Sequence, residues 1–170
     1  MVSLFLATCE VTVCQANEEC FDSVQPVECL CKAGFVFKNG VCEGGGVVQV
    51  IGLVINETYV PALSNRASKE FKALANKIEN STLNYLKNDL NFTDLIGVQV
   101  VSFKNGSIVT DFVIIFPPDS NDTSAEKLIN DINADFNDPN GKKNQLFADL
   151  GVDNSSLPTV KGNFHLVFVC

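Results

Sequence analysis

The densest run of hydrophobic residues lies between Ile96 and Phe116 and is interrupted by the polar segment Lys104-Asn105-Gly106-Ser107. Asn-Gly between two arms rich in Val, Ile and Phe predicts a tight β-hairpin in which both turn residues have positive φ. The second arm alternates with a period of two, with Ile108, Phe112, Ile114 and Phe116 on one face and Val109, Asp111, Val113 and Ile115 on the other. Because the acidic Asp111 indicates that the second face is partly exposed, we expect the first face to point into the core.

The segments before this hairpin show one strand pattern and then a helical pattern. Residues 47–59 are apolar on both faces in their first half, as expected of a central strand, and Pro61 ends that strand. A helix capped by Ser64 or Asn65 should follow. This helix and a second helical stretch carry hydrophobic residues at helical spacing, namely Phe71, Leu74, Ile78, Leu83, Leu86 and Leu90.

The chain after the hairpin predicts further helices and a final strand. Thr123-Ser-Ala-Glu126 has the pattern of a capping box that opens a helix. The inner face of that helix carries Leu128, Ile129, Ile132 and Phe136. Asn144–Leu150 predicts a short helix that stops at Gly151, and Phe164–Val169 alternates weakly like a strand. The order strand, helices, strand, strand, helix, strand predicts an α+β fold, the βαββαβ ferredoxin-like sandwich with an antiparallel sheet and helices on one face.

Composition and charge limit the possible functions. With 170 residues, of which 46% are hydrophobic, the chain can form one ordinary domain together with a small module. Its formal net charge of −8 argues against nucleic acid and anionic membrane surfaces as partners. A membrane-spanning helix needs a run of about eighteen apolar residues, and none occurs, so we expect no direct membrane contact from this segment.

Cysteines and glycosylation patterns indicate the compartment. Six of the seven cysteines lie between Cys9 and Cys42, which is typical of a disulfide-stabilised module in an oxidising environment. The N-glycosylation pattern Asn-x-Ser/Thr occurs at Asn56, Asn80, Asn91, Asn105, Asn121 and Asn154. Both features predict an extracellular or cell-surface location. Because residues 1–8 lack the features of a complete signal peptide, we expect a truncated leader or the end of a preceding segment of a longer protein.

The cysteine spacing by itself leaves the disulfide pairing open, because six cysteines allow many pairings. A zinc site is the alternative for clustered cysteines. No Cys-x2-Cys pair and no nearby histidine is present, so we expect no metal and no cofactor. The triple glycine at residues 44–46 then predicts a short flexible linker, and therefore a domain boundary.

The segment Cys29-Leu-Cys31, followed by Lys-Ala-Gly34-Phe35, closely resembles the second half of an EGF-like module. The resemblance implies that residues 9–43 form this module. It also implies the disulfides Cys9–Cys20, Cys14–Cys29 and Cys31–Cys42. A unit of this size cannot bury enough surface to fold by itself, so each bridge is expected to contribute about 2–5 kcal/mol.

A second resemblance rests on three segments that occur in the right order. They are Leu53-Val-Ile-Asn-Glu-Thr-Tyr59, Ser68-Lys-Glu-Phe71-Lys-Ala-Leu74 and Val100-Val-Ser-Phe103-Lys-Asn-Gly106-Ser107-Ile-Val109. Through these segments, the chain from residue 47 to about residue 160 resembles a SEA domain, the extracellular module of membrane mucins, some adhesion receptors and the stems of membrane-anchored proteases. Many SEA domains cut themselves at a Gly-Ser bond followed by branched apolar residues. The resemblance therefore implies self-cleavage between Gly106 and Ser107.

The implied cleavage needs few groups. Ser107 Oγ would attack the carbonyl carbon of Gly106, and water would hydrolyse the resulting ester. Serine normally needs a base, and the only histidine, His165, lies far along the chain, so strain in the turn is expected to replace the base. Gly106 permits such distortion and leaves its carbonyl open to attack. Thr110 departs from the usual third branched apolar residue, although threonine is still β-branched.

Other interpretations of these residues remain open. Asn-Gly-Ser is common as an ordinary hairpin turn, and Asn105 belongs to a glycosylation pattern whose acceptor hydroxyl is that of Ser107, so a glycan would crowd the turn. We expect His165 to be a partly exposed packing residue and Cys170 to begin another EGF-like module. The aromatic residues Phe103, Phe112 and Phe116 are expected in the core.

We therefore expect an extracellular segment of a cell-surface or secreted glycoprotein that serves adhesion or shielding and is not an enzyme beyond a single self-cleavage. The expected domains are an EGF-like module at 9–43, a linker at 44–46, a SEA-like domain at 47–162 and a last strand with the start of a following segment at 163–170. After cleavage, residues 1–106 and 107–170 would stay associated, and the partners would be extracellular proteins or glycans. The alternatives are an uncleaved module in the stem of a membrane-anchored protease or receptor, and a receptor ligand acting through the loop Cys31–Cys42.

Calcium is predicted to leave the cysteine-rich module unchanged. EGF-like modules that bind calcium carry acidic residues just before the first cysteine, and here Leu4-Phe-Leu-Ala-Thr8 precedes Cys9 without a carboxylate. Asp22 follows Cys20, but Val27 stands where the accompanying pattern requires an aromatic residue. We expect identical NMR spectra of the chain in calcium and in excess chelator. Chelator-sensitive resonances in the module would contradict this expectation.

Overall fold

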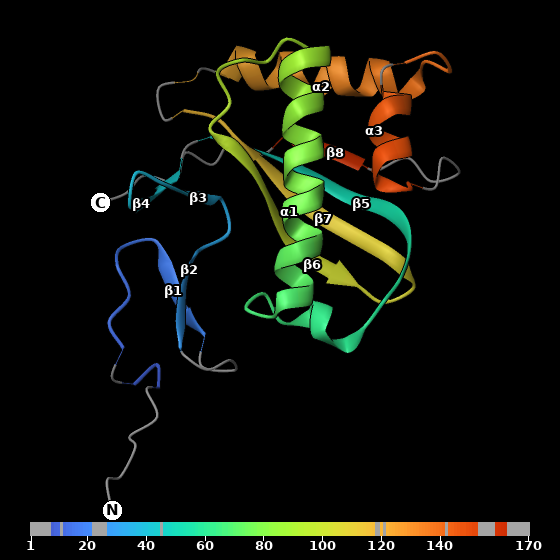
Figure 1. The fold of residues 1–170 in the computed structure, drawn as a ribbon. Helices are drawn as coiled ribbons and strands as arrows, with labels where there is room; N and C mark the ends of the chain where they lie inside the picture. The colour runs from blue at the N-terminus through green and yellow to red at the C-terminus, as the bar shows by residue number, and fades with distance from the viewer. Residues whose placement is uncertain are drawn as a thin grey trace, which may run out of the picture.

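The computed structural model describes residues 8–10, 12–21, 27–44, 46–117, 120, 122–141, 143–152 and 159–162. These residues form a small cysteine-rich module and a larger body in which helices pack on a four-stranded sheet (Figure 1). The module contains β1 (Glu18–Phe21), β2 (Glu28–Cys31), β3 (Phe35–Lys38) and β4 (Val41–Gly44). The body contains β5 (Val47–Thr58), η1 (Pro61–Ser64), α1 (Lys69–Asn84), η2 (Tyr85–Asp89), β6 (Gly97–Lys104), β7 (Ser107–Ile115), α2 (Asp122–Asn137), α3 (Lys143–Leu150) and β8 (Thr159–Gly162).

The sheet of the body has the strand order β6-β7-β5-β8, and all neighbouring strands are antiparallel. The helices and the sheet share one hydrophobic core, and α1 runs across the face of the sheet in Figure 1. This arrangement confirms the predicted α+β fold with ferredoxin-like βαββαβ order. Strand β8 is the fourth strand of the sheet, and the predicted last strand, Phe164–Val169, lies outside the described residues. Among the described helices, none has both the length and the apolar character that a membrane span requires.

From Thr110 to Ile115, strand β7 is buried on both faces, which differs from the prediction. The expected inner face is confirmed, because Ile108, Phe112, Ile114 and Phe116 all belong to the core. On the opposite face Val109 is partly exposed, but Asp111, Val113 and Ile115 are only 8%, 7% and 0% exposed. The prediction that this face is solvated at Asp111 is therefore wrong.

The cysteine-rich module covers part of this outer face. Gln99 of β6 pairs with Val113 of β7, and Gln99 Oε1 accepts a hydrogen bond from Gly34 N of the module at 2.7 Å. At the neighbouring pair, a Cβ atom on Gly97 would lie 3.1 Å from the side chain of Val36. Alternation along one strand cannot reveal this cover, because Gly34 is 65 positions away from Gln99 in the sequence.

The glycines between the module and the body lie in defined positions. Gly44 ends β4, and a Cβ atom there would lie 2.5 Å from the ring of Phe35, so only glycine fits. Gly46 is buried, and its carbonyl accepts a hydrogen bond from Phe116 N at 2.8 Å. Gly45 lies outside the described residues. The expected flexible linker is thus attached to the body at Gly46 and packed against the module at Gly44.

Helix α1 begins about one turn later than predicted. Its N-cap is Ser68, whose Oγ accepts a hydrogen bond from Phe71 N at 3.0 Å, so the prediction of Ser64 or Asn65 is wrong. The reason is local: residues 61–64 form the short 3-10 helix η1, and Asn65 Oδ1 accepts from the amide two residues later in an Asx turn. The predicted second helical stretch is the continuation of α1 through the π-helical turn η2.

The later helices agree with the prediction except at their starts, and α3 begins at Lys143, one residue before the predicted Asn144. Helix α2 begins at Asp122, so Thr123 lies inside the helix rather than at its cap, and the capping-box position is wrong. The predicted inner face is confirmed, with Leu128, Ile132 and Phe136 buried and Ile129 partly buried against them. Helix α3 ends at Leu150, and Gly151 follows with a positive φ of 65°, as its predicted stop requires.

Thr110 of β7 is 0% exposed, and its Oγ1 has no hydrogen-bond partner among the described residues. An unsatisfied buried hydroxyl costs about 1–3 kcal/mol, and valine has the same shape without the polar group. We therefore expect Thr110→Val to raise the free energy of unfolding by about 1–2 kcal/mol. Urea unfolding of the wild type and the variant measures this change in the free energy of unfolding. The matched control Thr159→Val, at an exposed threonine of β8, should leave the free energy of unfolding within about 0.5 kcal/mol. A destabilised Thr110→Val chain would show that the hydroxyl has a partner.

Candidate functional site

The predicted hairpin turn joins β6 to β7 at an exposed position. Asn105, Gly106 and Ser107 are all exposed, and Asn105 Oδ1 accepts a hydrogen bond from Gly106 N at 2.8 Å. Gly106 has a φ of 131°, in a region that favours glycine. Asn105 is not among the described residues with positive φ, so the prediction that both turn residues have positive φ is wrong. The unusual backbone geometry is concentrated at the residue that precedes the Gly106–Ser107 bond.

The strand after this bond is held firmly from its second residue onward. Ile108 is 1% exposed and pairs with Ile55 of β5. Thr58 of β5 pairs with Ser107, so residues 56–57 are extra residues in β5 at this point of the ladder. The regular pairing between β5 and β7 is therefore interrupted directly beside the serine. The buried Ile108 therefore anchors the start of the strand, while Ser107, beside the interrupted pairing, stays exposed.

The hydroxyl of Ser107 lies at the exposed start of β7. Within the part of the chain that the structure describes, the Ser107 hydroxyl has no hydrogen-bond partner. His165 lies outside the described residues. Because Ser107 is exposed, water can reach the adjacent bond. The geometry of the turn and the access of water are therefore the features of this bond that the described residues show.

The strand order determines how the pieces of chain before and after the Gly106–Ser107 bond are held together. Strand β7 lies between β6 and β5, so both neighbours of β7 precede Gly106 in the chain. The core likewise combines residues from both sides of the bond, such as Ile78 with Leu128. Breaking the bond would leave the two pieces joined by two strand ladders and one shared core.

The disulfides of the structure are Cys9–Cys20, Cys14–Cys29 and Cys31–Cys42. This is the pairing that the resemblance implied. All three lie on the N-terminal side of Gly106, so none crosses the turn. The sulfurs of Cys14 and Cys29 lie with Glu18 in a group whose spacing could suit a metal ion, but the two sulfurs are bonded to each other and are not available as thiolate ligands.

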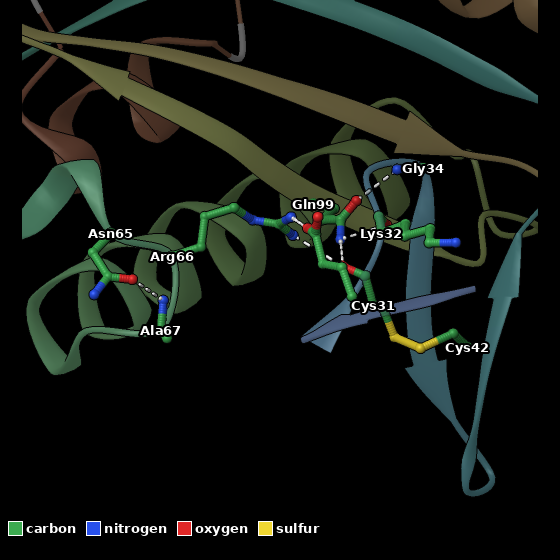
Figure 2. A network of polar contacts seen from close by, with 9 residues as sticks. Cys31, Lys32, Gly34, Cys42, Asn65, Arg66, Ala67 and Gln99 are labelled. Carbon is green, nitrogen blue, oxygen red and sulfur yellow. Dashed lines mark hydrogen bonds and ion pairs between the residues drawn. A yellow bond between two sulfur atoms is a disulfide. The ribbon is translucent and has the colours of Figure 1, made fainter. Parts of the chain in front are cut away.

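A polar cluster joins the cysteine-rich module to the body, and Arg66 is at its centre (Figure 2). The guanidinium forms an ion pair with the Glu19 carboxylate, and Arg66 Nη2 donates to the Cys31 carbonyl oxygen at 3.0 Å. The same group lies 5.9 Å from the ring centre of Phe21. A planar guanidinium can make these contacts together, whereas a lysine ammonium provides one point charge.

Gln99 of β6 makes the second connection in this cluster (Figure 2). Its Nε2 donates to the carbonyl oxygens of Lys32 at 3.2 Å and Cys31 at 3.4 Å, and its Oε1 accepts from Gly34 N at 2.7 Å. Gln99 is 8% exposed. Its side chain therefore gives the buried Gly34 N an acceptor and adds a second donor to two carbonyls that also accept from Arg66 Nη2 and Phe35 N.

Beside this cluster, α1, β6 and the module line an open pocket of about 390 Å³. Glu79 of α1 lines it and accepts a hydrogen bond from Val100 N of the edge strand β6 at 2.8 Å. Burial raises the pKa of Glu79 above its usual value, while the Val100 amide and the positive charge of Arg66 act in the opposite direction. The module and Glu79 together cover an edge strand that would otherwise present free backbone groups.

The glycosylation patterns fall on exposed positions wherever the structure describes them. The exposed asparagines are Asn56, Asn80, Asn91 and Asn105. Asn121 and Asn154 lie outside the described residues, as do Asp22 and Cys170. The aromatic residues Phe103, Phe112 and Phe116 are buried in the core, as expected.

Sequence reasoning missed three residues that organise these sites. Arg66 is the only arginine among 12 basic residues, and Gln99 is a polar residue inside an apolar strand. Both features are visible in the sequence and could have marked a buried polar contact. The alternation along its own strand places Asp111 on a solvated face. Its actual neighbours in the folded sheet are not adjacent to it in the sequence, so the pattern cannot show them.

A family model described as SEA domain matches residues 47–145, which is more than half of the chain. The match begins at the residue where the resemblance placed the start of this domain and includes the Gly106–Ser107 turn. No curated protein matches the chain.

Replacing Arg66 should loosen the module from the body. In Arg66→Met, Glu19 and the Cys31 carbonyl lose their common partner, and hydrogen bonds to charged groups contribute about 1.5–3 kcal/mol each. We expect ¹⁵N relaxation to show faster and more independent tumbling of residues 9–43, and Arg66→Lys to be intermediate. Lys69→Met removes a positive charge from an exposed lysine nearby and should change nothing. Unchanged relaxation in Arg66→Met would contradict this role of Arg66.

Proposed function

Because the chain belongs to the SEA domain family, we propose that it is an extracellular segment of a cell-surface or secreted glycoprotein that cuts itself once, between Gly106 and Ser107, and remains associated afterwards. The family and the three disulfides indicate an extracellular domain. The observation that carries the proposal is the exposed Gly106–Ser107 bond, with a φ of 131° at its glycine, inside the matched region.

The proposed reaction is an acyl shift followed by hydrolysis. Ser107 Oγ attacks the carbonyl carbon of Gly106, and the bond from that carbon to the nitrogen of Ser107 breaks. The hydroxyl proton ends on the released amine, and the new bond is an ester. Water then hydrolyses the ester to give the carboxylate of Gly106 and the free hydroxyl of Ser107.

Strain replaces the general base in this proposal. A serine hydroxyl is a weak nucleophile, and Ser107 has no hydrogen-bond partner among the described residues that could accept its proton. Distorted backbone at a functional site persists when the surrounding structure holds it in place. Here the surrounding structure is the buried Ile108 on one side of the turn and strand β6 on the other.

We further propose that the cut gives a non-covalent joint. The pieces 1–106 and 107–170 share the β5–β7 and β6–β7 ladders and the hydrophobic core. Burying this apolar surface stabilises the association without a covalent link. The cysteine-rich module, which we assign as EGF-like, stays with the first piece. The joint would serve adhesion or shielding, with extracellular proteins or glycans as partners.

Wild-type protein from a secretory host should run as two pieces on a denaturing gel and elute as one species under native conditions. Reductant should not change the separation, because none of the three disulfides among the described residues crosses the turn. Ser107→Ala should give one intact chain of the same fold, since it removes only the nucleophile from an exposed position. Ser64→Ala makes the same chemical change at another exposed serine and should leave cutting unchanged.

Two further variants identify the nucleophile and the effect of a glycan. Ser107→Cys should still cut, because a thiol performs the same shift. Asn105→Gln retains Ser107 and removes the glycosylation pattern, so cutting should stay the same or increase. If the folded wild-type chain is still intact after long incubation, the proposal of self-cleavage is contradicted. The turn would then be an ordinary hairpin, and the segment an uncleaved interaction module.

A further inference from the structure

The ladders on both sides of β7 are interrupted opposite the same residue. On the β5 side, Val50 pairs with Phe112 and Leu53 with Thr110, so two β5 residues face Asp111 alone. On the β6 side, the register shifts by one residue between Val100 and Ser102, and Ser102 pairs with Asp111. Two β-bulges, one in each neighbouring strand, therefore meet at one aspartate of the central strand.

The carboxylate of Asp111 binds donors from both bulges. Asp111 Oδ1 accepts a hydrogen bond from Gly52 N of β5 at 3.0 Å. Asp111 Oδ2 accepts from Ser102 Oγ of β6 at 3.3 Å and from Lys104 Nζ at 2.5 Å. The carboxylate is thus shared between the strands on either side of its own.

This arrangement has a physical reason. A bulge leaves a backbone amide without its ladder partner, and Gly52, with a φ of 83°, is such a bulged residue. Burying a carboxylate is costly unless it is paired and hydrogen-bonded. Asp111 is 8% exposed, and its three donors satisfy that condition while also satisfying the bulged amide.

The same contacts reach the turn. Lys104 is the last residue of β6 and directly precedes Asn105. Ser107 lies four residues before Asp111 on the same strand. Because side chains alternate along a strand, a shift of one residue in register would turn each side chain of β7 to the opposite face. The register at both bulges therefore determines where the strand ends that flank the turn lie, and with them the backbone torsions at Gly106 and Ser107.

We propose that Asp111 is the positioning residue of the self-cleavage reaction: its carboxylate fixes β5 and β6 against β7 in the register at which the torsions of the turn direct Ser107 Oγ at the Gly106 carbonyl carbon. This inference rests on the proposed function. Asp111 touches no reacting atom, and it acts through Gly52, Ser102 and Lys104. Losing it lets the bulges relax, and the distortion of the turn relaxes with them.

The test separates positioning from general stability. Pulse-chase of the full chain in a secretory host gives the rate of cutting for Asp111→Ala and Asp111→Asn. The control is Leu128→Ala, a core change in α2 at a residue that is 0% exposed. Each variant is also made with Ser107→Ala, so that urea unfolding of an intact chain gives its stability and the cutting rates are compared at matched loss of stability.

Asp111→Ala should slow cutting by about 10–100-fold, the size expected for a misplaced reacting group. Asp111→Asn should be slowed less, because its amide oxygen still accepts from Gly52 N. Leu128→Ala should cut within about threefold of wild type. If Asp111→Ala is not secreted as folded protein, the cutting rate of Asp111→Asn is compared with that of Leu128→Ala at matched loss of stability. A slower rate in Asp111→Asn then supports the positioning role, and an equal rate contradicts it.

Two outcomes would overturn the inference in different ways. If the wild type cuts and the Asp111 variants cut at the wild-type rate, or are slowed no more than Leu128→Ala at equal stability, the proposed function stands and the positioning role fails. If the wild type itself stays intact, the proposed function fails and the positioning role fails with it.

Discussion

The position of β7 between β6 and β5 is the constraint on which the rest of the structure depends. One face of β7 packs in the core, and the other is buried along Asp111, Val113 and Ile115. A strand that is held at both edges, and on both faces from Thr110 onward, cannot easily shift its register. The packing of the whole sheet is therefore available to maintain unusual geometry at Gly106, which one hairpin alone could not do.

The position of β7 also decides which parts of the molecule would belong to each piece after a cut at the turn. The contacts of Arg66 and Gln99 with the cysteine-rich module all lie before Gly106, so a cut at the turn would leave that module docked on α1 and β6. Strand β7, by contrast, would be held only by its ladders and by the core. Separating the pieces would require removing a central strand from between two neighbours and exposing apolar surface on both pieces.

The sequence predicts most of the fold and only part of the candidate site. The hairpin, the helix faces and the βαββαβ order follow from local periodicity, because each depends on neighbours in the sequence. The cap of α1 at Ser68 was missed because Ser64 and Asn65 have the same cap-forming chemistry and are used by local turns. The outer face of β7 was misjudged because its cover comes from a separate module, and the role of Asp111 depends on two bulges that no periodicity reveals.

The most direct test of the account is identification of the N-termini in wild-type protein that has been purified as one native species and then denatured. Self-cleavage between Gly106 and Ser107 predicts a second N-terminus that begins Ser107-Ile-Val-Thr. It should appear in a one-to-one ratio with the first N-terminus, without any added protease. A single intact mass, or a second N-terminus at any other residue, would contradict it.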